Sequence, residues 1–254
     1  MNRIIGIILI AISAASFGTL AIIGRFAYAD GLDVTTLLFL RFSIAAVLMF
    51  AWMCIRKEPL PRGRTLLQLA GMGGLGYVGQ SFCFMSAIQY ASTGLVALLL
   101  YLYPVFVTIL TVIFQKVKLT RRTILALTLA TVGAALTANP QGGTLPGILL
   151  AVGAALIYAF YILVGTGVMQ KVSSVQSSAV IFASAALVFG IITVIKGAHW
   201  PVTQSGWLAV TGIALVSTML PVATFLAGLK IIGATDASLL STLEPVVTVV
   251  LAAL

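Results

Sequence analysis

Two copies of one pattern, Leu102-Tyr103-Pro104-Val105 and Leu243-Glu244-Pro245-Val246, lie 141 residues apart, the difference between positions 102 and 243. Each copy places a proline inside a long apolar run. The same shift brings further pairs together without a gap: Gly6-Ile7 and Gly147-Ile148, Ser43 and Ser184, Gly71 and Gly212, Phe84 and Phe225, and Leu98-Leu99 and Leu239-Leu240. Identities between apolar residues carry little weight alone, but the shared order of runs and prolines predicts an internal duplication, with units at 1–141 and 142–254.

The composition excludes a water-soluble protein. Of the 254 residues, 61% are hydrophobic and 7% are charged, and the mean hydropathy is +1.19. A soluble domain carries about 25% charged residues, so this chain cannot be a soluble enzyme, a disordered tail or a secreted disulfide module. Because the apolar runs are long and do not alternate with polar residues, they predict membrane helices rather than the strands of a barrel.

Nine apolar runs approach the length of about 20 residues that a membrane-spanning helix needs. They lie at 4–28, 34–55, 66–89, 92–114, 122–138, 146–168, 176–195, 206–229 and 235–254. The segments between them are short and carry turn or charge signals, so consecutive helices are expected to be antiparallel neighbours. The sequence therefore predicts an all-α membrane protein with nine spans in this chain.

The basic residues predict how these spans are oriented. With a cytoplasmic N-terminus, eleven of the fourteen Lys and Arg residues fall in cytoplasmic segments: Arg3, Arg56, Lys57, Arg62, Arg64, Lys116, Lys118, Arg121, Arg122, Lys171 and Lys230. This distribution follows the positive-inside rule. The net charge of +9 is spread over short clusters and forms no patch on one domain, so nucleic acid is not an expected partner.

The duplication and the number of spans together give the two units opposite orientations. A unit of five spans crosses the membrane an odd number of times, so the second unit enters from the other side. Inverted repeats are typical of secondary transporters that work by alternating access, with the substrate site near the midplane between the repeats. The second unit, 142–254, matches only positions 1–113 and ends inside an apolar run, so a tenth helix is expected to be missing.

Four stretches resemble a known family: Phe39-Leu40-Arg41-Phe42, Leu102-Tyr103-Pro104-Val105-Phe106, Leu119-Thr120-Arg121-Arg122 and Leu243-Glu244-Pro245-Val246-Val247. The chain is similar over essentially its whole length to the EamA family of the drug/metabolite transporter (DMT) superfamily, ten-helix proteins made of two inverted five-helix halves. The resemblance implies a transporter and not an enzyme, located in the bacterial inner (plasma) membrane. It also implies export of amino acids or related metabolites, although no single motif identifies the cargo.

Two ionisable residues lie deep inside apolar runs, where a charge costs about 2.5–3.5 kcal/mol. Glu244 and Arg41 each follow the nearest acidic residue at the start of their run by eight positions, or about 12 Å of helix. Glu244 is predicted to bind a cationic group or to carry a coupling proton; the alternative is a structural carboxylate bonded to other helices. Arg41 is expected to balance this charge or to meet a carboxylate, unless it bonds helix-end carbonyls or snorkels.

Aromatic and polar side chains at helical spacing complete the predicted substrate site. They are Tyr77, Gln80, Ser81, Phe84, Tyr101, Tyr103, Tyr158, Tyr161, Ser217 and Ser241, together with Glu244. Such a set suits an amphiphilic cavity for a zwitterion or an aromatic compound. The alternative for each tyrosine is packing between helices with its hydroxyl bonded across the interface. Pro104, Pro221 and Pro245 each remove a backbone hydrogen bond inside a run and are predicted hinges.

Other functions find less support in the sequence. A membrane enzyme acting on lipids needs clustered His, Asp or Glu, whereas the five acidic residues are scattered. One histidine and two separated cysteines cannot assemble an ordinary zinc site, so no metal is expected. The glycine run 71–79 follows no strand and indicates close helix packing rather than a dinucleotide loop, so no cofactor is expected. A passive channel or facilitator remains the main alternative; the expected partners are a small-molecule substrate, membrane lipids and, for coupling, protons.

Overall fold

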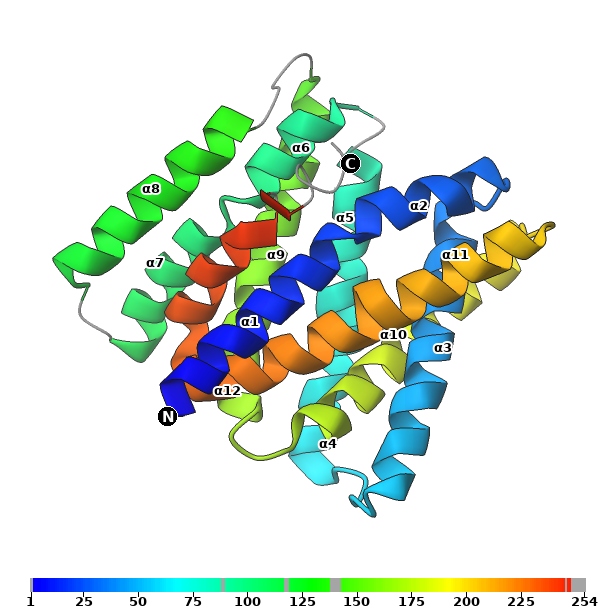
Figure 1. The fold of residues 1–254 in the computed structure, drawn as a ribbon, viewed down its shortest axis with the longest axis horizontal. Helices are drawn as coiled ribbons and strands as arrows, with labels where there is room; N and C mark the ends of the chain where they lie inside the picture. The colour runs from blue at the N-terminus through cyan, green and yellow to red at the C-terminus, as the bar shows by residue number, and fades with distance from the viewer. Residues whose placement is uncertain (1, 88–89, 117–118, 138–142, 245, 248–254) are drawn as a thin grey trace.

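The computed structural model describes residues 2–87, 90–116, 119–137, 143–244 and 246–247, and helices account for most of them (Figure 1). In chain order the elements are α1 (Asn2–Gly18), α2 (Leu20–Ala29), α3 (Val34–Ile55), α4 (Gly63–Gly71), the π-helix η1 (Met72–Tyr77), α5 (Val78–Ala87), α6 (Thr93–Leu100), α7 (Tyr103–Gln115), α8 (Arg121–Thr137), α9 (Leu145–Val168), α10 (Ser174–Lys196), α11 (Gln204–Ala214), the π-helix η2 (Leu215–Met219), α12 (Leu220–Leu240) and the short 3₁₀ helix η3 (Ser241–Leu243).

Six of the described helical segments are long and apolar enough to cross a membrane. They are Arg3–Ala29, Val34–Ile55, Leu98–Gln115, Leu145–Val168, Ser174–Lys196 and Gln204–Leu243. Many large apolar side chains on these helices face outward, including Val47 at 67% and Val194 at 84% exposure. A soluble surface of this kind would aggregate, whereas lipid hydrocarbon covers it without cost. The fold is therefore that of an all-helical membrane protein.

Over the described residues the helices follow the expected apolar runs, with breaks inside the first and the fourth run and one between the last two. The first run divides at Thr19 into α1 and α2, and the fourth divides before Tyr103, where Pro104 occupies the first turn of α7. Proline disfavours helical geometry in the residue before it and suits the start of a new helix. Gly233, with φ +81°, separates the two runs that α12 joins, in a conformation that glycine adopts at little steric cost.

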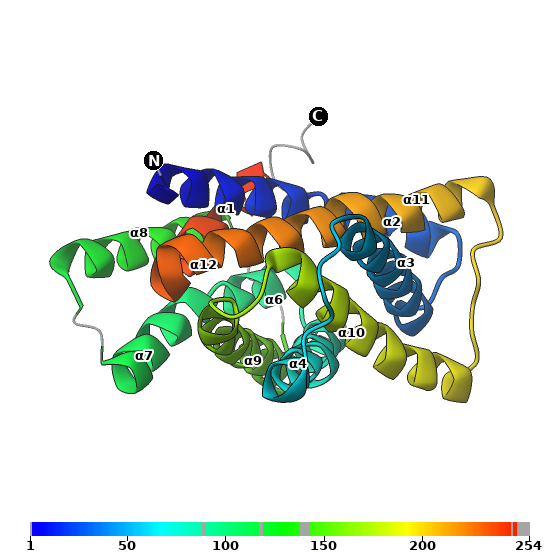
Figure 2. The same ribbon diagram turned by 90° about the horizontal axis from the view of Figure 1, so that it is seen from below.

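Elements that correspond under the 141-residue shift pack against one another in a symmetrical way. Helix α3 corresponds to α10, and these two make the most extensive contact between described helices. Helix α1 packs along α12, while their counterparts α9 and α5 also pack together. In Figure 2, α1, α2, α11 and α12 form one layer, and α9 and α10 lie beneath it. The pairing shows that each half contributes helices to the packing of the other.

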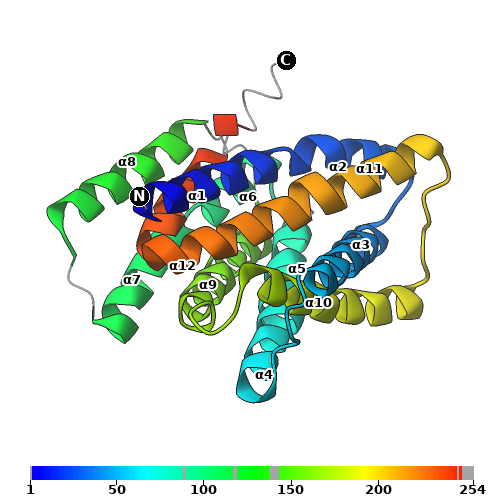
Figure 3. The same cartoon turned by 60° about the horizontal axis from the view of Figure 1, so that its bottom comes forward.

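The two π-helices also lie at corresponding positions. Met72–Tyr77 moved by 141 positions falls on 213–218, which overlaps the second π-helix, Leu215–Met219. Each lies between two α-helices of one nearly straight segment, and the α4–η1–α5 segment is visible as a single rod in Figure 3. A π-helical turn inside an α-helix is rare and is frequent at functional sites. Its occurrence at corresponding positions supports the duplication on geometry as well as on sequence.

The glycine run predicted to serve close packing does so at Gly73. A Cβ atom there would collide with the backbone carbonyl oxygen of Ile181 on α10, so η1 and α10 approach at the level of their backbones. At Gly76 a Cβ would lie 3.3 Å from the Tyr161 ring of α9. The small residues therefore let η1 contact both α9 and α10, and this brings Tyr77 close to side chains of the second half.

Loops at both ends of the α3–α10 pair join the two halves. Asp33, the N-cap residue of α3, lies 3.5 Å from His199, which follows α10. At the other end Ser173, the N-cap residue of α10, donates its hydroxyl to Glu58, which follows α3. We call the first contact the Asp33–His199 tie and the second the Glu58–Ser173 tie. Glu58 and His199 are 141 residues apart and Asp33 and Ser173 are 140 apart, so the two ties lie at nearly equivalent positions of the repeat.

Candidate functional site

A continuous row of aromatic rings runs through the contact between the halves. The ring of Phe42 on α3 lies 5.3 Å from Tyr77, which in turn lies 5.7 Å from Tyr161 on α9. Tyr161 is 5.9 Å from Tyr158. Tyr158 then contacts Tyr103 of α7 at 4.9 Å, the shortest of these distances. Edge-to-face and offset arrangements at such separations are favourable. We call Phe42, Tyr77, Tyr161, Tyr158 and Tyr103 the aromatic row.

Arg41 lies at one end of the aromatic row. Its side chain is buried, with 4% exposure, and the guanidinium carbon is 4.8 Å from the centre of the Phe42 ring. This arrangement is a cation–π contact, which gains strength when water is excluded. The guanidinium also donates toward the Tyr77 hydroxyl. Arg41 therefore points into the protein and does not snorkel to the surface.

Glu244 lies toward the other end, directly after η3. Its carboxylate is within electrostatic range of Tyr101, Tyr103 and Tyr158, and it also acts on Tyr77. Tyr103 and Glu244 are corresponding residues of the two copies of the proline pattern, so the two copies meet at this point. The cluster thus combines a buried cation, a carboxylate and several phenol groups from both halves.

The polar groups around Tyr103 are mostly bonded to backbone. The Tyr103 hydroxyl donates to the Ser238 carbonyl at 3.4 Å, and Ser241 donates to the Ala237 carbonyl at 2.9 Å. Tyr101 extends the row, with its ring 6.5 Å from that of Tyr103. The structure therefore brings Tyr77, Tyr101, Tyr103, Tyr158 and Tyr161 together, with Ser241 and Glu244 at the same end.

Three predicted residues make contacts elsewhere. Ser217 is fully buried and its hydroxyl hydrogen-bonds that of Thr19, 2.7 Å away, so it joins η2 to the first run. Phe84 packs on the separate cluster of Ala87, Val96 and Ala151. Ser81 donates weakly to its neighbour Gln80, at 3.4 Å. The Ser217 hydroxyl is therefore bonded across helices.

The predicted hinges differ in their surroundings. Pro104 begins α7 and follows the break between α6 and α7. Pro221 lies just after η2, and its carbonyl accepts a hydrogen bond of 2.8 Å from Ser13 of α1. Pro245 lies outside the described residues. The break predicted near Pro221 is therefore a π-helical turn that is held against α1.

Sequence reasoning missed two aromatic members of this site. Phe42 links Arg41 to Tyr77, and Phe225 of α12 lies 6.5 Å from Tyr158. Phenylalanine within an apolar run carries no polar group that distinguishes a site from a lipid-facing surface. The available signal was position: Phe42 follows Arg41 directly, and Phe225 corresponds to Phe84 in the repeat.

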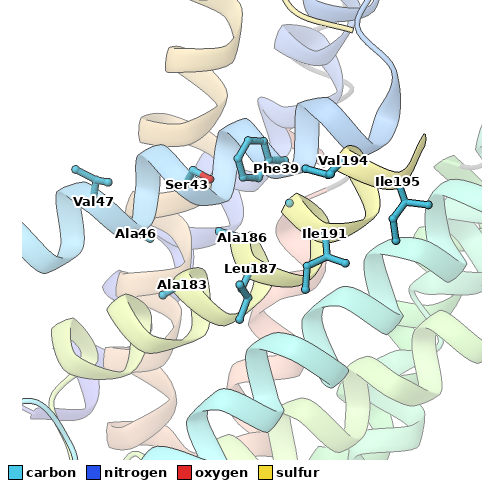
Figure 4. A pocket seen from close by; sticks show the side chains of 11 residues that line it. Phe39, Ser43, Ala46, Val47, Ala183, Ala186, Leu187, Ile191, Val194 and Ile195 are labelled. Carbon is cyan, nitrogen blue, oxygen red and sulfur yellow. The ribbon is translucent and has the colours of Figure 1, made fainter. Parts of the chain in front are cut away.

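Two pockets described in the structure lie away from the aromatic row. The larger, about 620 Å³, is a groove between α3 and α10 whose walls are apolar except for Ser43 (Figure 4). Such a lining suits hydrocarbon rather than a metabolite with charged groups. A second pocket of about 290 Å³, between α7, α8 and α12, is lined by threonines and Asp236. Asp236 already pairs with Arg3 at 3.0 Å.

Comparison with known proteins identifies the family. A model of the EamA-like transporter family matches residues 4–139 and again residues 145–254. The chain belongs to the EamA-like transporter family. Both halves match the same EamA model, which agrees with the internal duplication. This EamA protein is therefore an integral membrane transporter and not an enzyme.

Relatives and a solved structure agree with the EamA assignment. An uncharacterized transporter of Archaeoglobus fulgidus is 31% identical over 93% of this chain and 82% of its own length. The uncharacterized transporter YxxF of Bacillus subtilis is 26% identical over 96% of this chain and 80% of its own. A crystal structure matches with a TM-score of 0.83 at 22% identity, covering 97% of this chain and 86% of the other. That last likeness shows that the EamA chain shares its fold.

Proposed function

We propose that this EamA protein is a secondary active transporter that exports small organic metabolites, amino acids foremost, across the plasma membrane of a bacterium. Membership of the EamA-like transporter family already indicates transport, and the proposal adds the kind of solute and the direction. The single observation that carries the proposal is the cluster of Arg41, Glu244 and the aromatic row, which combines a guanidinium, a carboxyl group and hydrogen-bonding phenols. An amphiphilic solute with a carboxylate, an amine and an apolar part is complementary to such a set.

The proposed mechanism is alternating access of two inverted halves, each of five spans when complete, with a cytoplasmic N-terminus. The reciprocal packing of α3 with α10, and of α1–α12 with α9–α5, supports this because each half contributes helices to both sides of a common interface. The ties at both ends of α3 and α10 support it too, since each end is closed by its own set of contacts between the halves, which can open separately. Substrate sites of such transporters lie between the repeats, as the aromatic row does.

The proposed roles of the residues follow from their chemistry. Glu244 binds the cationic group of the substrate or a proton that couples transport to the proton gradient. The tyrosines, with Gln80 and Ser81 about one turn after Tyr77 on the same segment, line the route that opens when the halves move. Pro104, Pro221 and Pro245 are the proposed hinges, because each interrupts the hydrogen bonds of its helix.

A counterflow experiment tests the proposal. Purified protein is reconstituted in lipid vesicles preloaded with each of a panel of amino acids, and uptake of the labelled compound is followed with and without a pH gradient. We expect saturable flux that internal substrate stimulates. Glu244→Gln and Tyr101→Ala should abolish it while the protein still inserts, whereas Tyr90→Ala, at a half-exposed tyrosine away from the row, should not. Full transport by both site variants contradicts the site; flux that rises linearly with concentration indicates a channel.

A further inference from the structure

Arg41 is a buried cation without a carboxylate partner among the described residues. The ion pairs in that part of the chain are Arg3–Asp236, Arg56–Glu58 and Asp33–His199, and none includes Arg41. It contacts the Phe42 ring and the Tyr77 hydroxyl and interacts electrostatically with the Tyr28 hydroxyl, and none of these groups carries a formal charge. A buried charge is normally paired or bound to a ligand, because desolvation without compensation is costly.

Two buried polar groups, one on either side of Tyr77, have no hydrogen-bond partner within the described part of the chain. One is the Nε of Arg41 itself, and the other is the hydroxyl of Tyr161, a residue with 4% exposure. Tyr77 lies between them, since its hydroxyl faces Arg41 and its ring is 5.7 Å from that of Tyr161. Unpartnered buried groups are rare in proteins. Here two of them, both able to donate, flank one tyrosine.

The chemistry of these groups indicates an anionic ligand. Arginine is a donor only, and its Nε and terminal nitrogens form a planar fork that matches a carboxylate. Both tyrosine hydroxyls can donate to the same acceptor. The three groups also come from both halves, with Arg41 and Tyr77 in the first and Tyr161 in the second. A ligand held by all three would therefore bridge the interface that must open and close.

We propose that Arg41, Tyr77 and Tyr161 form a carboxylate-binding subsite. This inference rests on the proposed function and deepens it: the transported solutes are organic carboxylates, and the carboxylate lies at the Arg41 end of the aromatic row. The remainder of the solute extends over Tyr158 toward Tyr103 and Glu244. In the resting protein the subsite is closed by ring packing, and separation of the halves admits the ligand.

The first test measures binding without transport. Purified protein in detergent is titrated with three pairs of acid and amide, namely benzoate and benzamide, L-leucine and L-leucinamide, and L-phenylalanine and L-phenylalaninamide, and the shift in Tm gives the apparent Kd. We expect at least one acid to bind more tightly than its amide. If no acid is preferred over its amide, or if none of the six compounds binds, the subsite is refuted.

Variants assign that preference to the proposed residues. Tyr161→Phe removes only a hydroxyl without a partner among the described residues, so the fold should be retained, while binding of the preferred acid weakens about tenfold, the loss of one hydrogen bond to a charged group. Arg41→Gln should abolish the preference for the acid, and Arg41→Lys should restore part of it. Tyr90→Phe is the matched control and should bind as the wild type does. Unchanged acid preference in both Tyr161→Phe and Arg41→Gln overturns the assignment.

The counterflow assay separates this inference from the proposed function. If the wild type exchanges acids and their amides equally, the transport function stands and the carboxylate subsite is wrong. If it exchanges no amino acid but binds an acid through Arg41, the subsite stands and amino-acid transport is wrong. Each proposal therefore has an outcome that contradicts it alone.

Discussion

At the scale of single residues, Tyr161 offers a test that separates a structural role from a functional one. Its buried hydroxyl has no partner in the described ranges, and such a group destabilises the folded state by the cost of its desolvation. We predict that Tyr161→Phe raises the stability of the ligand-free protein, by about 1 kcal/mol. Thermal unfolding of the purified variant measures this. A lower Tm would mean that the hydroxyl has a stabilising partner and is not held ready for a ligand.

Asp30 gives a second prediction at this scale, outside the spans. The Thr203 hydroxyl and the amides of Val202 and Thr203 donate to its carboxylate, and these hydrogen bonds hold the pKa of Asp30 below its ordinary value of 3.8. A lowered pKa in the folded state means that the stabilisation is complete above the ordinary value. It is lost as the pH falls through the lower, folded value.

Asp30→Asn should therefore lower the Tm at neutral pH and make the Tm less sensitive to acid below about pH 4. Melting curves of both proteins between neutral pH and about pH 2 check this. Lys196→Gln, at an exposed basic residue, serves as the control. Parallel acid profiles for wild type and Asp30→Asn would exclude the proposed contribution.

Among individual residues, the charged ones were the most predictable. A charge inside an apolar run is costly wherever the helix packs, so Arg41 and Glu244 are recognisable from the amino-acid sequence alone. Their neighbours are not, because hydropathy treats Phe42 as it treats any lipid-facing phenylalanine. The hydrogen bond between Ser217 and Thr19 could not be predicted from the sequence either, because it depends on which helix lies opposite η2.

At the scale of elements, Gly73 and Gly71 form a matched pair for testing the close approach of η1 and α10. A Cβ at Gly73 would collide with the Ile181 carbonyl oxygen, whereas a Cβ at Gly71 would meet nothing within 4 Å. Gly73→Ala should destabilise the protein by about 1–3 kcal/mol through overpacking. Gly71→Ala should be neutral or stabilise it by up to about 1 kcal/mol, as alanine does in a helix.

Denaturation of the two variants in detergent, compared with the wild type, measures this difference. Equal stability of Gly73→Ala and Gly71→Ala would show that η1 can move away from α10 without cost. If Gly73→Ala is more stable than the wild type, the close approach of η1 to the α10 backbone is contradicted.

Helix boundaries were predictable where the chemistry of the backbone sets them. Pro104 and Gly233 mark breaks because proline lacks an amide donor and glycine tolerates positive φ. The break at Thr19 and the π-helix η1 were not predicted, and the break expected near Pro221 was predicted without its π-helical form. A π-turn moves hydrogen bonds by one residue without changing the apolar pattern, so periodicity cannot report it.

At the scale of the whole molecule, the two ties at the ends of the α3–α10 pair give a prediction for transport. With Cys54 and Cys83 replaced by serine, cysteines at Asp33 and His199 are joined by a short bifunctional thiol reagent that reduction releases. The cross-link should stop counterflow, and reduction should restore it, because the proposed alternating access requires that end to open. Each single-cysteine variant, treated in the same way, should keep its flux. Full flux in the cross-linked protein would exclude movement at this end.

At this scale the sequence predicted the all-helical membrane fold and the duplication, but it predicted nine spans where the described residues hold six candidate spans. The 141-residue shift anticipated which elements correspond, and the packing of α3 with α10 agrees with it. It did not show that the copies of the proline pattern meet, with Tyr103 and Glu244 as neighbours. A repeat defines equivalent positions, but only the docking of the halves decides which of them come into contact.

The two ties are counterparts in position but differ in chemistry, a carboxylate with an imidazole at one end and a carboxylate with a hydroxyl at the other. The ratio of the two conformations of an alternating-access carrier depends on the free-energy difference between its closed ends, so a small change at one end shifts the population. Substitution of His199 and substitution of Glu58 should therefore bias the resting carrier in opposite directions. Under the proposed mechanism the protein therefore has a set point that mutation can adjust at either end of the α3–α10 pair, away from the proposed substrate site.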